Sequence, residues 1–156
     1  MLIKISGLIL AFVFFSSIGF YQSYKLKKRK DNLCTILLFL NRMCTSIQYR
    51  NDDLFLLVSK CCDDILTPLK EVKSDTSEYS QKISALPLNK EDKTLLEKFF
   101  SGLGTSDIDG QIRHISLYTN FFNELYEKSK TDIEKKSKLY TLSGVFAGLT
   151  FVVMFI

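Results

Sequence analysis

The fold is decided by residues 106–156, which read SDIDGQIRHISLYTNFFNELYEKSKTDIEKKSKLYTLSGVFAGLTFVVMFI. In the first part of this stretch apolar residues recur at helical steps, with no proline among them, at Ile108, Ile112, Ile115, Phe122, Tyr126 and Ile133. Ser106 or Asp107 can cap the start, and residues 139–156 carry no charge. We therefore predict one helix over Asp107–Ile156. At 1.5 Å per residue, its uncharged end matches the ~30 Å hydrocarbon core of a membrane.

A second uncharged run, Ile5–Tyr24, is also long enough to span a membrane. A cleaved signal peptide is the competing interpretation, but such a signal carries its basic residues before the apolar run. Here only Lys4 precedes the run, whereas five basic residues follow it within Lys25–Lys30. Both runs have their basic flank toward the middle of the chain, so the positive-inside rule predicts that residues 25–138 lie in the cytoplasm.

The middle of the chain shows helical apolar patterns and no sustained alternation of the kind that predicts strands. Four helices are expected there, with apolar faces over Leu33–Ile47, Leu54–Leu69, Tyr79–Leu86 and Leu95–Leu103. Residues 51–53 and Asn89 are candidate caps at helix starts. Gly102 and Gly104 are expected to take the left-handed conformations that end a helix.

The predicted fold class is all-α, with a cytoplasmic helical bundle over residues 25–138 between N- and C-terminal transmembrane helices over 1–24 and 139–156. The whole chain has a net charge of +4, but the part from Asp31 to Glu134 holds 12 basic and 17 acidic residues. A nucleic-acid-binding domain would carry its basic residues on itself, so this class of partner is excluded.

Residues that would carry catalysis or bind a metal are scarce. The cysteines Cys34, Cys44, Cys61 and Cys62 form no Cys-x-x-Cys pair, so we expect small buried hydrophobes in a reducing compartment. The single histidine, His114, is expected to be a surface or packing residue rather than a general base. No phosphate-binding loop and no zinc-protease or serine-hydrolase motif occurs. The sequence thus predicts no enzyme activity, no cofactor and no metal, although a cation site between helices stays open.

Small residues recur within both uncharged runs. Gly144 and Gly148 form a Gly-x-x-x-Gly pattern, and Gly7 with Ala11 repeats the same spacing of small residues. Small residues let transmembrane helices approach closely. These four residues are therefore candidates for packing between the two runs or against a partner, which leaves a homo-oligomer open.

The polar start of the long helix holds the candidate partner-binding residues Ser106, Asp109, Gln111 and Arg113. An exposed arginine is a common residue at protein interfaces, so Arg113 is the preferred docking candidate. Asp107 is expected to cap the helix, and Gln111 has the alternative role of fixing the neighbouring loop. A structural role and a docking role therefore compete at this turn.

Two segments carry a resemblance to a known family. Residues 88–115, which contain the sequence LGTSDIDGQ, resemble the LG-x-SD-x-x-x-Q stretch of the stage III sporulation protein AB family of endospore-forming bacteria. Ile47–Tyr49 resembles that family's short E-I-x-Y-G turn, with Ser46 and Arg50 in place of its glutamate and glycine. The length and the two terminal uncharged runs match as well, so the resemblance covers essentially the whole chain.

The resemblance implies a component of the channel complex that joins the mother cell to the forespore, with a soluble domain similar to the F-type platform protein of type II secretion. Such a platform is not an enzyme. It would sit in the mother-cell membrane and dock an assembly ATPase, the AA protein of the complex, to ring-forming membrane partners. The residues alone also allow a small membrane-anchored sensor or regulator that binds a cation or a peptide. A membrane-bound enzyme would require convergent titratable groups that the sequence does not show.

The two basic flanks generate a prediction about orientation. A reporter that is active only in the cytoplasm, fused at Ser77, should be active because the positive-inside rule keeps the middle of the chain inside. A reporter that is active only outside the cytoplasm, fused at the same residue, is the control and should be silent. The opposite pair of results contradicts the predicted orientation.

Overall fold

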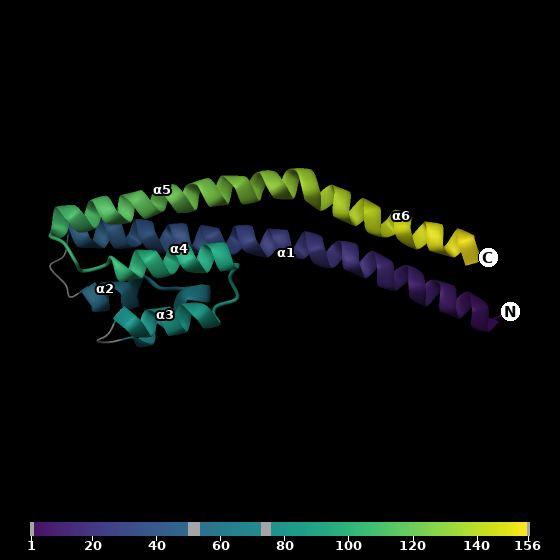
Figure 1. The fold of residues 1–156 in the computed structure, drawn as a ribbon, viewed down its shortest axis with the longest axis horizontal. Coiled ribbons are helices and arrows are strands. Elements are labelled where there is room, and N and C mark those ends of the chain that lie inside the picture. Colours follow the sequence, from purple (N-terminus) through teal and green to yellow (C-terminus); the bar gives the residue numbers. More distant parts are fainter. Residues whose placement is uncertain (1, 50–53, 73–75, 156) are drawn as a thin grey trace. The chain divides into compact units, whose positions relative to one another are not determined.

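The computed structural model describes residues 2–49, 54–72 and 76–155 (Figure 1). Some side chains within its helices are not described, namely those of residues 2–12, 15–16, 49, 76–77, 151–152 and 154–155. The candidate packing residues Gly7 and Ala11 are among them, so their predicted role lies outside the described residues.

The regular structure is entirely helical. In chain order the elements are α1 (Leu2–Tyr49), α2 (Leu54–Cys61), η1 (Asp64–Glu71), α3 (Thr76–Ala85), α4 (Lys90–Ser101), α5 (Ile108–Asp132), η2 (Ile133–Ser137) and α6 (Lys138–Phe155). Of these, η1 is a 3₁₀ helix and η2 is a π-helical turn. No strand occurs in the described ranges, which confirms the predicted all-α class.

The chain divides into two compact units. The terminal unit comprises residues 1–30 and 127–156, and the central unit comprises residues 31–126. α1 and α5 each contribute residues to both units. The core and the polar turns of the central unit are therefore described from residues 31–126 alone.

The two predicted membrane spans, Ile5–Tyr24 and Leu139–Ile156, are helical in their described residues but are not supported as spans. Among the described residues, no helix combines the length and the mean hydropathy that crossing a membrane requires. The first run is the start of α1, which continues into the charged stretch Lys25–Lys30, and α6 begins at the charged Lys138. Several apolar side chains of both runs lie outside the described set.

The core of the central unit is built from the apolar stripes that the sequence predicts. Its largest fully buried side chains are Leu33, Ile36, Phe39, Leu40, Met43, Leu57, Leu66, Leu69, Tyr79, Phe99, Phe100 and Phe122. Phe39 and Met43 do not belong to the apolar stripe predicted within Leu33–Ile47, which consists of Leu33, Ile36, Leu37, Leu40, Cys44 and Ile47. Phe39 widens that stripe because its ring packs against Phe99 and Phe100 of α4, at centroid distances of 6.2 and 6.0 Å.

The prediction of a single helix over Leu54–Leu69 is wrong, because α2 ends at Cys61 and a 3₁₀ helix begins at Asp64. Pro68 explains the break. It has no N–H to donate, and in a continuing α-helix its ring would clash with the carbonyl four residues earlier, that of Asp64. Asp64 instead adopts a left-handed conformation with a φ of 48°, after an extended Asp63.

Two basic side chains hold this break in place. Arg42 of α1 donates a hydrogen bond to the carboxylate of Asp63, and Lys70 of η1 lies 3.5 Å from the other carboxylate oxygen. The hydrogen bond from Arg42 is the main cause that lowers the pKa of Asp63. The carboxylate pair Asp63–Asp64 is thus part of a turn, not a cluster that converges on a ligand.

α3 and α4 form where the sequence predicts them, and they lie side by side (Figure 1). Asn89 stands at the N-cap position of α4 with an extended backbone, and its carbonyl accepts from the Lys93 N–H at 2.9 Å, whereas its side chain makes no capping hydrogen bond. After α4, Gly104 is left-handed as predicted, with a φ of +83°. Gly102 is not, since its φ is −93°.

The predicted helix over Asp107–Ile156 is helical through its described part, but its backbone is not uniform. α5 starts at Ile108, and the π-helical turn Ile133–Ser137 separates it from α6. Ile115 and Phe122 are buried as predicted, whereas Ile108 is 53% exposed. It lies in the first turn of α5, at the very start of the apolar stripe.

The four cysteines pack as small hydrophobes. Cys61 and Cys62 are buried, and Cys34 and Cys44 are half-buried. Burial raises the pKa of Cys62 to about 12, so this thiol stays protonated and unreactive in the folded chain. Their placement agrees with the packing role that the sequence predicts.

Phe99 provides the first test of this core. Phe99→Ala removes a fully buried ring and should lower the free energy of unfolding by ~3–5 kcal/mol, a large part of the ~5–15 kcal/mol usual for a domain. Thermal or denaturant unfolding of the chain measures the loss. Phe121→Ala on α5 is the matched control, since that ring is partly exposed and should cost much less. Equal losses would contradict the central place of Phe99.

Candidate functional site

The turn between α4 and α5 is fixed on one side by His114. Its Nε2 donates a hydrogen bond to the carbonyl of Phe99 at 3.0 Å, one of the last carbonyls of α4, which have no partner within the helix. The imidazole stacks on the Phe99 ring with centroids 5.5 Å apart and also contacts Tyr118. His114 is therefore a packing residue that closes the end of α4.

Gly102 is required for this arrangement. A Cβ atom at this position would lie 2.5 Å from Cε1 of His114, so any side chain would displace the imidazole. The glycine thus serves close packing of the turn against α5. The sequence predicts a left-handed conformation for Gly102, and the structure shows a packing role instead. A local pattern cannot show this role, because His114 lies twelve residues further along the chain.

The first turn of α5 is capped by Asp107, as predicted. Its Oδ1 accepts from the Gly110 N–H at 3.0 Å, and its carbonyl accepts from the Gln111 N–H at 2.8 Å. Gly110 makes room for the cap, because a Cβ there would lie 2.6 Å from Ser106 Oγ and 2.7 Å from Asp107 Oδ1. The start of α5 is therefore tightly determined.

Gln111 lies inside this turn and is only 4% exposed. Its amide Nε2 donates to Ser106 Oγ at 3.0 Å and is 3.4 Å from the Ser106 carbonyl. Of the two roles considered for Gln111, the structure therefore favours the fixing of the loop, and a buried side chain is unsuited to docking.

The other three candidates are exposed at the start of α5. Asp109 and Arg113 are four residues apart on α5, which places them on the same face, and Ser106 lies in the turn just before the helix. The next step along that face is Leu117, whose side chain is 50% exposed. We call these four residues the α5 strip. An arginine beside an exposed leucine offers a partner both charge and apolar area, and arginine is enriched at interface hot spots.

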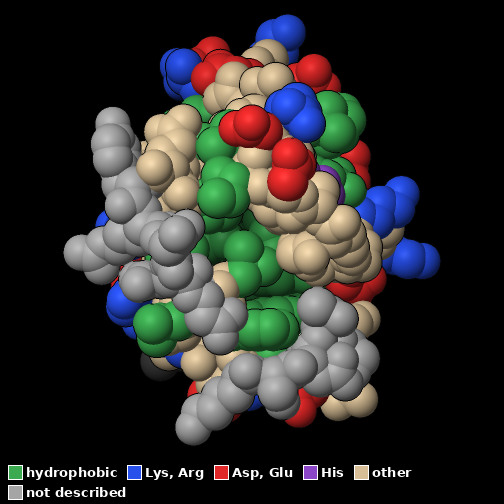
Figure 2. Space-filling model, turned by 90° about the vertical axis from the view of Figure 1, so that its left-hand side faces the viewer, with side chains coloured by type: hydrophobic (Ala, Val, Ile, Leu, Met, Phe, Trp, Pro, Cys, Tyr) green, Lys and Arg blue, Asp and Glu red, His purple; other side chains and the backbone are tan. Residues whose placement is uncertain are grey.

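A groove of about 800 Å³ runs between α4 and α5 further along. It is lined by Lys90, Glu91, Thr94, Leu95, Lys98, Tyr118, Phe121, Glu124 and Leu125. The sequence alone does not indicate it, because it arises only when the two helices lie together in antiparallel order (Figure 1). A smaller pocket of about 330 Å³ lies near Leu54 and Tyr79, at the end of the central unit where hydrophobic side chains gather (Figure 2).

In the terminal unit, the start of α1 and α6 pack through small residues. A Cβ on Gly19 would lie 2.6 Å from the Tyr140 carbonyl oxygen and 3.3 Å from the Gly144 Cα, so the backbones meet there without side chains. Close by, the hydroxyls of Ser23 and Ser137 share a hydrogen bond. Gly144 thus lies at a close contact of the two helices, opposite Gly19.

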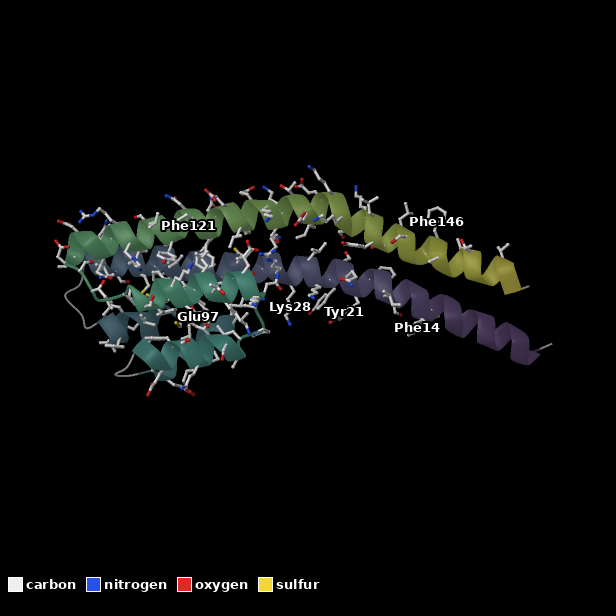
Figure 3. The ribbon with its side chains drawn as sticks, viewed as in Figure 1. Phe14, Tyr21, Lys28, Glu97, Phe121 and Phe146 are labelled. Carbon is white, nitrogen blue, oxygen red and sulfur yellow. The ribbon has the colours of Figure 1, made fainter. Side chains whose placement is uncertain are left out.

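The outer sides of this helix pair are apolar. Large exposed hydrophobic side chains on them are Val13, Phe14, Ile18, Phe20, Tyr21 and Tyr24 of α1, and Leu139, Tyr140, Leu142, Phe146, Leu149 and Val153 of α6. Tyr21 and Phe146 point away from the opposite helix of the pair (Figure 3). Gly148, the other member of the predicted pattern, is buried.

No set of three or more His, Cys, Asp and Glu residues comes together as a metal site within the described part of the chain. The described residues thus form a helical protein with a capped polar turn, an exposed strip and a groove.

The family model described as stage III sporulation protein AB matches residues 4–84 and 77–156 of this chain. The chain therefore belongs to the stage III sporulation protein AB family, as its resemblance indicates, and its role falls in stage III of sporulation. No curated protein and no solved structure matches the chain.

The cap at Asp107 can be tested directly. Asp107→Ala should lower the free energy of unfolding by about 1 kcal/mol, because the Gly110 N–H loses its acceptor. Asp107→Asn is the control, since an asparagine oxygen accepts the same bond and should keep most of that stability. Thermal unfolding distinguishes the two, and an equal loss in both variants would indicate that charge rather than capping matters.

Proposed function

We propose that the chain is a non-catalytic platform in the channel complex between the mother cell and the forespore, where it docks an assembly ATPase to ring-forming membrane proteins. Membership in the stage III sporulation protein AB family supports a role at this stage. The platform role, the partner and the location are parts of the proposal.

The observation that carries the proposal is the α5 strip. Ser106 is exposed just before α5 and Asp109 and Arg113 are exposed on α5 itself, at a helix start whose backbone is fixed by the Asp107 cap and by buried Gln111. A rigid surface loses little conformational entropy when a partner binds. Arg113 offers charge and hydrogen bonds, and Leu117 offers apolar area, within one face of the helix.

The terminal unit supports a place in the mother-cell membrane. A soluble protein rarely leaves large apolar side chains exposed along two adjacent helices, as Phe14, Tyr21, Leu142 and Phe146 are here. Basic residues, those of Lys25–Lys30 and of Lys135–Lys138, flank these apolar faces in the sequence. Such residues favour contact with anionic lipid headgroups, so we propose that the helix pair anchors the chain and leaves the central unit in the cytoplasm.

Arg113→Ala in the full-length chain tests the docking role. We expect normal thermal stability, because this side chain is exposed, together with a clear loss of co-purifying ATPase, since interface arginines often contribute ~2 kcal/mol or more. Lys130→Ala is the matched control, as an exposed cation on the same helix outside the strip. Undiminished co-purification of the ATPase with the Arg113 variant would remove the strip from the interface.

A further inference from the structure

The two compact units carry net charges of opposite sign. The terminal unit, residues 1–30 and 127–156, holds 11 basic and 3 acidic side chains, whereas the central unit, residues 31–126, holds 10 and 14. Ten of the 11 basic residues of the terminal unit lie in two short segments, Lys25–Lys30 and Lys128–Lys138. A concentration of positive charge on one unit favours an anionic partner for that unit.

The packing of α1 against η2 and α6 brings these two segments together, and we call them the basic collar. The hydroxyls of Ser23 and Ser137 share a hydrogen bond, which places the starts of the two segments level on antiparallel helices (Figure 1). The hydrogen bond from Lys136 is the main cause that lowers the pKa of Asp132, and the charges of Lys128 and Arg29 lower it further. Arg29 of α1 therefore lies near the other segment, and the collar draws charge from both helices.

Acidic side chains neutralise only part of the collar. Those in or directly beside it are Asp31, Glu127, Asp132 and Glu134. Glu127 lies 3.7 Å from Lys130, and Asp132 lies 2.7 Å from Lys136. The lysines of the collar that are exposed and form no ion pair with the described residues are Lys25, Lys27, Lys28, Lys135 and Lys138. With ten basic and four acidic residues, the collar keeps an excess of six positive charges.

Tyrosines lie next to the collar on the side of the chain ends. All three tyrosines of the terminal unit, Tyr21, Tyr24 and Tyr140, stand within four residues of Lys25 or Lys138. Their side chains are 65%, 62% and 40% exposed. Tyrosine is enriched at the membrane–water interface, where its ring meets hydrocarbon and its hydroxyl meets water.

Phenylalanines lie further from the collar on both helices. Figure 3 shows this order along α1, from Lys28 through Tyr21 to Phe14, and the exposed Phe146 lies beyond Tyr140 on α6. Basic, amphipathic and apolar side chains thus follow one another along the helix pair. The headgroups, the interface and the hydrocarbon of a bilayer follow in the same order.

We propose that the basic collar binds the phosphate groups of anionic phospholipids, so that the terminal unit selects anionic over zwitterionic lipid. The inference rests on the proposed anchoring of the helix pair in a membrane and adds the class of lipid. A lysine ammonium binds a phosphate as a point charge and requires no fixed geometry, which suits a mobile lipid headgroup. A nucleic acid would neutralise the same lysines but would leave the apolar faces beside them uncovered.

The test compares spin-labelled phosphatidylglycerol with spin-labelled phosphatidylcholine in bilayers that contain the full-length chain. Electron spin resonance measures the fraction of each label held at the protein surface, which gives the ratio of the two association constants. At low salt the wild-type chain should favour phosphatidylglycerol roughly fivefold, because its negative charge lies close to the collar lysines. The ratio should fall toward one in ~1 M salt, since the interaction is then screened.

Two double variants test the two segments separately. Lys25→Gln with Lys28→Gln, and Lys135→Gln with Lys138→Gln, should each lower the ratio about twofold, and all four changes together should bring it close to one. The matched control is Lys90→Gln with Lys98→Gln, which removes two exposed lysines from the central unit and should leave the ratio unchanged. All these lysines are exposed, so thermal unfolding of each variant should match that of the wild-type chain.

Equal association of the two lipids with the wild-type chain overturns the inference, including the case in which the collar binds a nucleic acid instead. So does a preference that persists in ~1 M salt, or one that the central-unit control lowers as much as the collar variants do. A chain that is retained in bilayers and co-purifies the ATPase without any lipid preference would overturn only the inference. A chain that no bilayer retains would overturn the proposed anchoring as well.

Discussion

The central unit depends on the packing of one ring, Phe99. It contacts Phe39 of α1, its neighbour Phe100, and both His114 and Tyr118 of α5, so three helices meet at a single side chain. Aromatic pairs in edge-to-face and stacked arrangements add directional preference to apolar burial, which fixes how the helices are rotated as well as how close they lie. The stack on Phe99 also sets the position of His114, which in turn requires a glycine at position 102. The conformation of the polar turn after α4 therefore depends on packing in the core.

Most helices of the central unit follow from the apolar pattern, because burial on one face imposes a 3.6-residue period that is visible in the chain. The break after Cys61 escaped that pattern for a physical reason. Pro68 acts on the residue four positions before it, so a proline near an expected helix end can remove the whole preceding turn. The pattern also failed to predict the burial of Phe39, because this ring is covered by Phe99 and Phe100 of α4 and not by neighbours in its own segment.

The candidate site divides in the same way. The Asp107 cap is a local interaction, and sequence reasoning predicted it. The burial of Gln111 depends on how the turn folds back over its side chain, and the partner of Gly144 depends on the register between two helices that are more than one hundred residues apart. The groove between α4 and α5 could not be predicted from the sequence, because it forms only where the two helices pack together and is not a feature of either helix alone.

The four cysteines give the central unit a graded set of chemical probes. Cys34 and Cys44 are half-buried on one helix, whereas Cys61 and Cys62 are buried at the end of another. A thiol must become accessible and ionised before an alkylating reagent can modify it. The rates at which these positions are modified would therefore report local opening of α1 separately from opening of the α2 end, without any label being introduced. The chain lacks tryptophan and therefore has only weak intrinsic fluorescence. Its four native cysteines provide another means of following unfolding, at the positions where they lie.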